Sequence, residues 1–253
     1  MLISIDTEFE RRRTYRPVLS IVQVKEEGED AVIYDVREEK NNDNNIDGTV
    51  DIKTSNGDLQ HLKNILSEEN NVKIIHSCRQ DMEAIYSHFH FVMKNVFDTQ
   101  IAAKYLGFGN EIGYAKLVGF VCHKDIIKEK RLQHSNWLKR PLSYEQIIYA
   151  KQDVEFLQQI YNELLKMFDR NKTAYQQFKK ECKDLEDEKY YKFNPELVWQ
   201  KYKHKIGYTK NYYLVKKLFF EREKKAYQRN LPREFVWKFE DLVKFANERC
   251  EKN

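Results

Sequence analysis

Five residues combine types and spacings that suit metal-dependent chemistry: Asp6, Glu8, Asp81, Tyr149 and Asp153. Asp6 and Glu8 are two positions apart in an apolar segment, so a strand there points both carboxylates to one face. Tyr149 and Asp153 are four positions apart, which places them on one face of a helix. Because burying like charges is costly unless a cation compensates, the pattern favours a site for a hard divalent cation with carboxylate ligands.

Each of these features, taken alone, also has a purely structural explanation. The strand pair fits the exposed polar face of an edge strand. In the helix pair, Asp153 could be an ordinary surface acid and Tyr149 an amphipathic packing residue. Asp81 follows the segment IIHSCRQ at the start of a predicted helix, where the helix dipole favours an acid. The separate pairs are therefore weak indications, and only their combination is specific.

Phosphodiester hydrolysis is one reaction that such a combination could perform. It needs a water that is deprotonated near neutral pH and a leaving 3′ oxygen that is stabilised as it becomes negative. Two divalent ions about 3.5–4 Å apart can do both. The acids that bind them must then converge from separate elements of the fold.

The elements that must position these residues can be predicted from hydrophobic periodicity. Alternation predicts strands at residues 1–9, 18–25 and 31–36, with a tight polar turn EEGED between the last two. Residues 38–58 are polar and predict a surface loop. A helix at 59–69, a strand at 71–76 and a helix from Arg79 follow, and from Asp98 onward the pattern is helical. The segment 143–168 predicts one long helix, with Ser143 as N-cap and Gln146 completing a capping box. The expected class is a mixed sheet covered by helices.

Composition sets broad limits on the protein. The chain has 253 residues, of which 41% are hydrophobic, enough for a packed core. It has no apolar run of transmembrane length, and its first residues lack the features of a secretory signal, so we expect no membrane association and a cytosolic location. None of the four cysteines forms a CxxC pair, which indicates reduced structural thiols. A monomer is the default expectation.

The C-terminal quarter differs in composition. Residues 179–194 are predicted to be a charge-rich linker, and residues 195–253 a helical region. From Trp199 to Asn230 there are ten Lys and Arg against two Glu, interleaved with aromatic residues. This distribution fits a surface that binds nucleic-acid phosphates. It fits equally well a solvated helix face.

Three motifs together resemble the ribonuclease D family, in the DEDDy subgroup of the DEDD 3′–5′ exonuclease superfamily. They read IDTEFERRRTYRPVLSIVQ, IIHSCRQDMEAI and LKRPLSYEQIIYAKQDVEFL, and the segments VFDTQIAAKYLGF and SNWLKRPL between them are also similar. The resemblance covers residues 2–165. It implies a ribonuclease H-like (DnaQ-like) α/β exonuclease domain over residues 1–178. Residues 214–246 are similar to the core of the helical HRDC module, which implies a partial HRDC-like region over 195–253.

The resemblance also implies roles for the site residues, with two divalent ions, Mg²⁺ or Mn²⁺, as cofactors. Asp6 would bridge both ions, and Glu8 and Asp153 would complete the ion that holds the attacking water. Asp81 would support the second ion through water, and Tyr149 would orient the attacking water. The substrate contacts that the resemblance implies are Thr7, Phe9, His76, Gln80 and Tyr149; from its position at a strand end, His76 also fits a satisfied core or rim histidine.

The function implied is a metal-dependent 3′→5′ exoribonuclease that trims RNA, with tRNA precursors favoured, and releases 5′-mononucleotides. Two alternatives stay open: a single-stranded DNA exonuclease, and an inactive, truncated RNA-binding remnant. The sequence departs from the family pattern in four places. It begins at the first catalytic strand, has a longer loop at 38–58, lacks the last HRDC helices, and carries Asn136 where the family often has Asp.

Overall fold

The computed structural model describes the chain except for residues 38–51, 128, 207–208, 210 and 250–253. It separates into two compact units: an α/β unit of Met1–Glu10 and Val18–Tyr191, and a helical unit of Arg11–Pro17 and Lys192–Asn253. None of the described helices is long and apolar enough to cross a membrane.

The α/β unit is built on a six-stranded mixed sheet with the order β4-β3-β2-β1-β5-β6. Strand β1 pairs antiparallel with β2, and β2 with β3, whereas β1–β5, β5–β6 and β3–β4 are parallel. The strands are β1 (Leu2–Glu10), β2 (Val18–Glu26), β3 (Val32–Asp35), β4 (Ile52–Lys53), β5 (Val72–Ile75) and β6 (Val96–Asp98).

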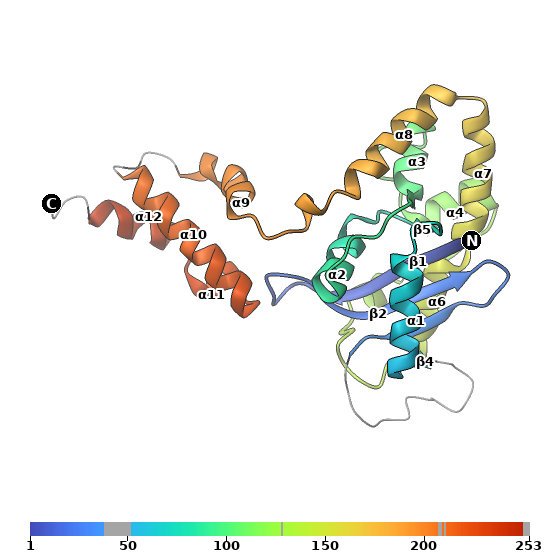
Figure 1. Ribbon diagram of the computed structural model, residues 1–253, viewed down its shortest axis with the longest axis horizontal. Coiled ribbons are helices and arrows are strands. Elements are labelled where there is room, and N and C mark those ends of the chain that lie inside the picture. The colour runs from blue at the N-terminus through green and yellow to red at the C-terminus, as the bar shows by residue number, and fades with distance from the viewer. Residues whose placement is uncertain (38–51, 128, 207–208, 210, 250–253) are drawn as a thin grey trace. The chain divides into compact units, whose positions relative to one another are not determined.

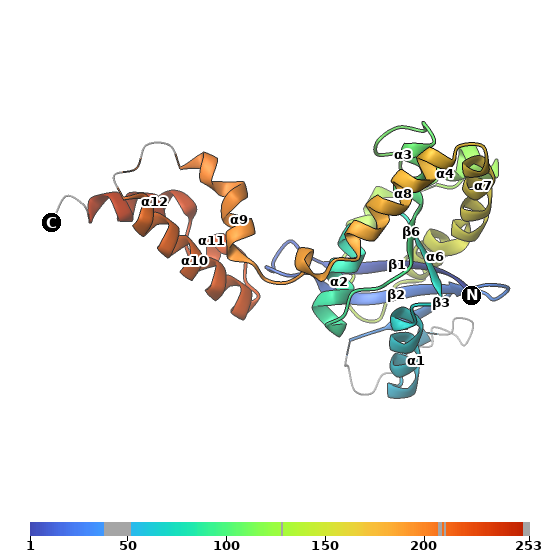
Figure 2. The same cartoon turned by 45° about the horizontal axis from the view of Figure 1, so that its top comes forward.

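Helices cover both faces of this sheet (Figure 1). One core cluster joins β1 and β2 to α1 and α2, and another joins β2 and β3 to α6, so α1 and α6 lie on opposite faces (Figure 2). The helices of this unit are α1 (Asn56–Ser67), α2 (Arg79–Phe89), α3 (Thr99–Tyr105), α4 (Tyr114–Cys122), α5 (Lys130–Gln133), α6 (Tyr144–Glu155), α7 (Leu157–Asp169) and α8 (Lys172–Leu185), with a short 3₁₀ turn at Glu188–Tyr190.

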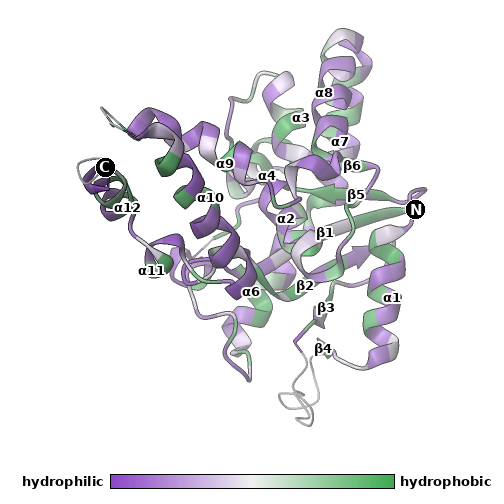
Figure 3. Ribbon diagram, turned by 60° about the vertical axis from the view of Figure 1, so that its left-hand side comes forward, coloured by the Kyte–Doolittle hydropathy of each residue, from purple (hydrophilic) through white to green (hydrophobic). Residues whose placement is uncertain are grey.

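Hydropathy accounts for this arrangement. Alternate residues of β1 lie in different surroundings: Ile3 and Ile5 belong to the core under α1 and α2, whereas Asp6 and Glu8 are only half-buried. Figure 3 shows both hydrophobic and hydrophilic residues along α1, as expected for a helix with one buried face. The predicted mixed sheet flanked by helices is confirmed.

The structure corrects several predicted elements. Residues 96–98 form strand β6, which the sequence did not reveal because three residues are too few for a periodic signal. The predicted loop 38–58 lies partly outside the described residues, but its end contains β4 and the start of α1, which Ser55 caps with Asp58 in a capping box. The predicted helix 143–168 is two helices, α6 and α7.

The predicted linker 179–194 also differs from the structure. Its first residues continue α8, where Phe178 and Cys182 are buried against the core, and the two units divide after Tyr191. Cys78, Cys122 and Cys182 are buried free thiols.

The helical unit contains α9 (Pro195–Tyr202), a 3₁₀ turn (Lys203–Lys205), α10 (Tyr212–Arg229), α11 (Arg233–Val236) and α12 (Phe239–Glu248). Trp199, Val215, Phe219 and Leu242 lie in its core. The carboxylate of Glu223 is fully buried there and accepts hydrogen bonds from Arg222 (2.8 Å), Arg233 (2.9 Å) and the hydroxyl of Tyr15 (2.7 Å). This buried charge is therefore paired, as stability requires.

Candidate active site

Three of the predicted acids converge on one face of the sheet. One carboxylate oxygen each from Asp6, Glu8 and Asp153 lies within 4.8 Å of the others, and Asp153 is buried while the other two are half-buried. Three like charges this close repel one another unless a cation lies between them. Hard divalent ions take oxygen ligands of this kind, so the donor set fits Mg²⁺ or Mn²⁺.

The position of Asp153 depends on how α6 begins and where it packs. The Ser143 side chain accepts from the Gln146 backbone, and the Gln146 side chain accepts from the Ser143 backbone, so the predicted capping box is confirmed. Helix α6 packs against β1, β2 and β3. This contact brings Tyr149 and Asp153, one turn apart on the same face, towards the carboxylates of β1.

Tyr149 is held in its protonated form. Burial and then the nearby carboxylates of Asp153, Glu8 and Asp6 raise the pKa of its hydroxyl well above the ordinary value. A phenol that does not ionise near neutral pH is a hydrogen-bond donor. Tyr149 can therefore orient a water or a substrate oxygen beside the acids, but it cannot act there as a base.

Asp81 is placed differently from the other acids and is not part of the close group of three. It lies in the first turn of α2, where its Oδ1 accepts a hydrogen bond of 2.5 Å from the Thr7 hydroxyl. Burial raises the pKa of Asp81 to about 7, although the bond from Thr7 opposes the shift. The contact joins α2 to β1 at the residue between Asp6 and Glu8.

The predicted substrate residues occupy varied surroundings. His76 is hydrogen-bonded on both ring nitrogens, Nδ1 with the Thr99 hydroxyl (2.8 Å) and Nε2 with the Ile112 carbonyl (3.0 Å). Gln80 is exposed in the first turn of α2, and Phe9 is half-buried against the core under α1 and α2. Substrate contacts by Thr7, Phe9, His76 and Gln80 stay predictions.

Tyr114 is a residue near the site that sequence patterns did not single out. Its hydroxyl donates to the Gln152 carbonyl (3.3 Å) and accepts from the Phe156 amide (3.1 Å). In a continuous helix that amide would bond to that carbonyl, so the hydroxyl is inserted into the ladder where α6 ends and α7 begins. The break lies within one turn of Asp153, since α6 ends at Glu155. Burial raises the pKa of the Tyr114 hydroxyl, and the carboxylates of Asp153 and Asp6 raise it further.

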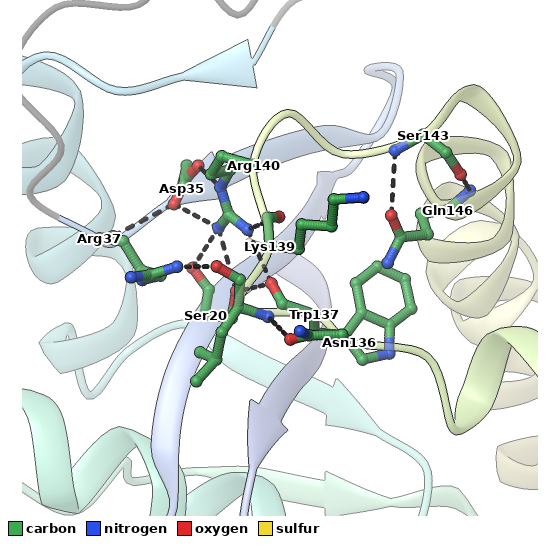
Figure 4. A network of polar contacts seen from close by, with 10 residues as sticks. Ser20, Asp35, Arg37, Asn136, Trp137, Lys139, Arg140, Ser143 and Gln146 are labelled. Carbon is green, nitrogen blue, oxygen red and sulfur yellow. Dashed lines mark hydrogen bonds and ion pairs between the residues drawn. The ribbon is translucent and has the colours of Figure 1, made fainter.

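The ring of Tyr149 packs against the buried ring of Trp137, with 6.0 Å between the ring centroids. A polar network holds the backbone of Trp137 in place. The Trp137 carbonyl accepts from Ser20 Oγ (2.6 Å) and Arg140 Nη1 (2.7 Å). Arg140 in turn forms a buried bidentate ion pair with Asp35 at the end of β3 (Figure 4). The segment SNWLKRP is thereby fixed to the sheet.

Comparisons with known proteins identify the family to which this chain is similar. Residues 2–169 match the family model described as 3′-5′ exonuclease. The ribonuclease D of Gluconacetobacter diazotrophicus is 32% identical over 244 residues, which cover 96% of this chain and 57% of that protein. The chain thus spans little more than half the length of this curated relative.

Solved structures give the same result for the fold. The Escherichia coli RNase D structure, titled an exoribonuclease involved in structured RNA processing, superposes with a TM-score of 0.79 at 26% identity and covers 98% of this chain and 60% of its own. The Brucella melitensis NrnC structure with bound Mg²⁺ has a TM-score of 0.55 at 24% identity over 70% of this chain and 80% of its own, a likeness of fold alone.

Proposed function

Because the chain belongs to the 3′-5′ exonuclease family, we propose that it is a monomeric, cytosolic exoribonuclease that trims RNA from the 3′ end and releases 5′-mononucleotides. The observation that carries this proposal is the convergence of Asp6, Glu8 and Asp153 within 4.8 Å. The similarity of the chain to ribonuclease D over nearly its whole length supports RNA as the substrate. We propose tRNA precursors as the favoured class from the motif resemblance.

The proposed chemistry uses divalent ions, Mg²⁺ or Mn²⁺, as enzymes of this family do. When bound, two ions supply a water deprotonated near neutral pH and stabilise the leaving 3′ oxygen. Asp6, Glu8 and Asp153 would hold the ions, with Asp6 shared between them, and Asp81 would support the second ion through water.

The protein's own groups then orient the reacting atoms. The Tyr149 hydroxyl, which stays protonated, hydrogen-bonds the attacking water and aligns it with the scissile phosphorus. The Trp137 ring behind Tyr149 keeps it directed at the acids. The backbone at Thr7 and the side chains of Phe9, His76 and Gln80 hold the 3′ end of the RNA.

The test is hydrolysis of a 3′-extended tRNA precursor with Mg²⁺ or Mn²⁺. Asp6→Asn and Asp153→Asn should each lower the rate by more than about 100-fold, because even the partners of metal ligands contribute about 10- to 100-fold. Glu155→Gln is the matched control, since Glu155 lies on the same helix but pairs with Lys25 (2.8 Å). If both aspartate variants trim as fast as wild type, the site is assigned wrongly.

A second arm separates the alternative substrates. RNA and DNA strands of one sequence are compared under the same conditions, and a preference for RNA of at least tenfold is expected if 2′-hydroxyl groups are recognised. Equal cleavage of DNA would favour the single-stranded DNA exonuclease. Binding of RNA without metal-stimulated cleavage would favour the inactive binding protein.

A further inference from the structure

Gln23 lies on β2 directly opposite Asp6 of β1 in the antiparallel register. Opposite residues of such a pair lie on the same face of the sheet, with Cβ atoms about 4.5–5.5 Å apart. The side chain of Gln23 therefore stands next to the acid cluster, on the face that α6 covers.

The amide of Gln23 is buried without a hydrogen-bond partner. The residue has 0% exposure, and neither its Oε1 nor its Nε2 hydrogen-bonds to any part of the chain that the structure describes. Its partner on β3 is Ile33, and Ile21 precedes it on the same face; both are fully buried in the apolar cluster under α6. An apolar residue at position 23 would avoid the desolvation cost of the amide.

Only one other sheet residue of the α/β unit, among those described, has a buried unpartnered side-chain atom: Ser4, whose hydroxyl is also fully buried. Ser4 is opposite Lys25 and not a carboxylate. The strand register therefore distinguishes these two residues: Gln23 is opposite a predicted metal ligand, and Ser4 is not.

We propose that Gln23 is a positioning residue of the metal site: its amide N–H, which has no partner within the described part of the chain, donates to the Asp6 carboxylate when a divalent ion is bound and fixes the orientation of that carboxylate. Carboxylate ligands of metal ions are commonly hydrogen-bonded by such partners, which orient them. The proposal rests on the proposed function, since it takes Asp6 to be a metal ligand. Gln23 closes the first of the three motifs, and the resemblance assigned it no role.

The experiment measures Mn²⁺ binding to the full chain by isothermal titration calorimetry, with no RNA present. Gln23→Met keeps the size of the side chain and removes the amide. We expect the dissociation constant for Mn²⁺ to rise 10- to 100-fold, the range typical of partners of metal ligands. The melting temperature of the metal-free variant should be unchanged or higher, because the unpaired buried amide is gone.

Ser4→Ala is the matched control, because it removes the other unpaired buried polar group of the sheet. It should bind Mn²⁺ within twofold of wild type. Gln23→Asn, which keeps an amide but withdraws it by one methylene, should weaken Mn²⁺ binding in the same direction and provides a second variant if Gln23→Met does not fold.

The outcomes are distinct. Wild-type Mn²⁺ affinity in a folded Gln23 variant, or an equal loss in Ser4→Ala, would overturn the proposal. Asp153→Asn serves as the reference for the site itself and should abolish Mn²⁺ binding. If Asp153→Asn instead binds Mn²⁺ like wild type, the proposed metal site fails, and the failure is not specific to Gln23.

Discussion

At the residue scale, the acids of the site are not equivalent. Asp6, Glu8 and Asp153 share one small volume, whereas Asp81 is buried on α2 against the Thr7 hydroxyl. Its position explains why its pKa is raised to about 7, since burial outweighs the hydrogen bond. Without a bound metal ion, burial destabilises the ionised form of the Asp81 carboxyl.

A pH-dependent stability follows for the metal-free protein. The pKa of Asp81 is raised from 3.8 to about 7, so between these values the native state binds more protons than the unfolded state and stability falls as pH rises. Asp81→Asn should therefore be more stable than wild type at pH 8. Each unit of pKa shift corresponds to about 1.4 kcal/mol, so the gain in unfolding free energy is a few kcal/mol at most. Below pH 4 the two should be equal.

The measurement is urea unfolding in EDTA at pH 4, 6 and 8. Asp125→Asn is a control, because Asp125 is an exposed acid of the same unit. An equal or lower stability of Asp81→Asn at pH 8 would contradict the assignment of a raised pKa.

At the element scale, the junction of α6 and α7 matters most. The sequence has good helix formers on both sides of Phe156, so nothing local ends the helix there. The break coincides instead with the hydroxyl of Tyr114, which comes from α4 and takes the place of one ladder hydrogen bond. A distant side chain thus sets the direction of the last turn of α6, which carries Asp153.

Removing this single oxygen should affect the metal site more than stability. In Tyr114→Phe the Phe156 amide and the Gln152 carbonyl can bond to each other, so the melting temperature should change by only about 2 °C. The end of α6 should shift, and a misplacement near 1 Å can cost about 100-fold in rate. We expect a 10- to 100-fold lower kcat with an unchanged KM for RNA.

Tyr161→Phe is the control for Tyr114→Phe. Tyr161 lies on α7 with its ring 4.7 Å from that of Phe97, and its hydroxyl is not part of the junction. Steady-state kinetics at saturating Mg²⁺ check the prediction. Wild-type kcat in a folded Tyr114→Phe would show that the junction does not position Asp153.

At the scale of the whole molecule, the chain combines a cluster of three acids with a basic helical unit. Helix α10 buries Val215, Phe219 and Ala226 in the core of that unit and exposes Tyr213, Lys217 and Lys224. The exposed set is spaced along one side of the helix. The likeness of this unit to an HRDC module stays a prediction. Charge reversal at Lys217 and Lys224 tests whether the exposed side of α10 binds RNA.

The double variant Lys217→Glu/Lys224→Glu should weaken RNA binding without altering the chemistry. Each lysine that contacts a phosphate contributes about one unit to the slope of log K against log salt, so the slope should fall by about two. KM for RNA should rise while kcat stays within twofold. Lys166→Glu/Lys172→Glu makes the same charge change in the α/β unit and is the control. Equal effects of the two double variants would indicate only a general charge effect.

The sequence by itself determined the local part of the site. Period two on β1 places Asp6 and Glu8 on one face, and the capping box of Ser143 starts the helix that carries Tyr149 and Asp153. These features depend on neighbouring residues, so pattern and motif resemblance were enough to predict them and the fold class.

Only the tertiary structure decided what depends on residues far apart in the chain. The convergence of β1 with α6, the bond from Thr7 to Asp81 and the break that Tyr114 makes are all contacts between distant segments. The burial of Gln23 opposite Asp6 belongs with them, because strand register is fixed by pairing and packing across the whole sheet. The periodicity of the sequence predicts which face of a strand or helix a residue occupies. Which distant residue it contacts on that face depends on how the strands and helices pack.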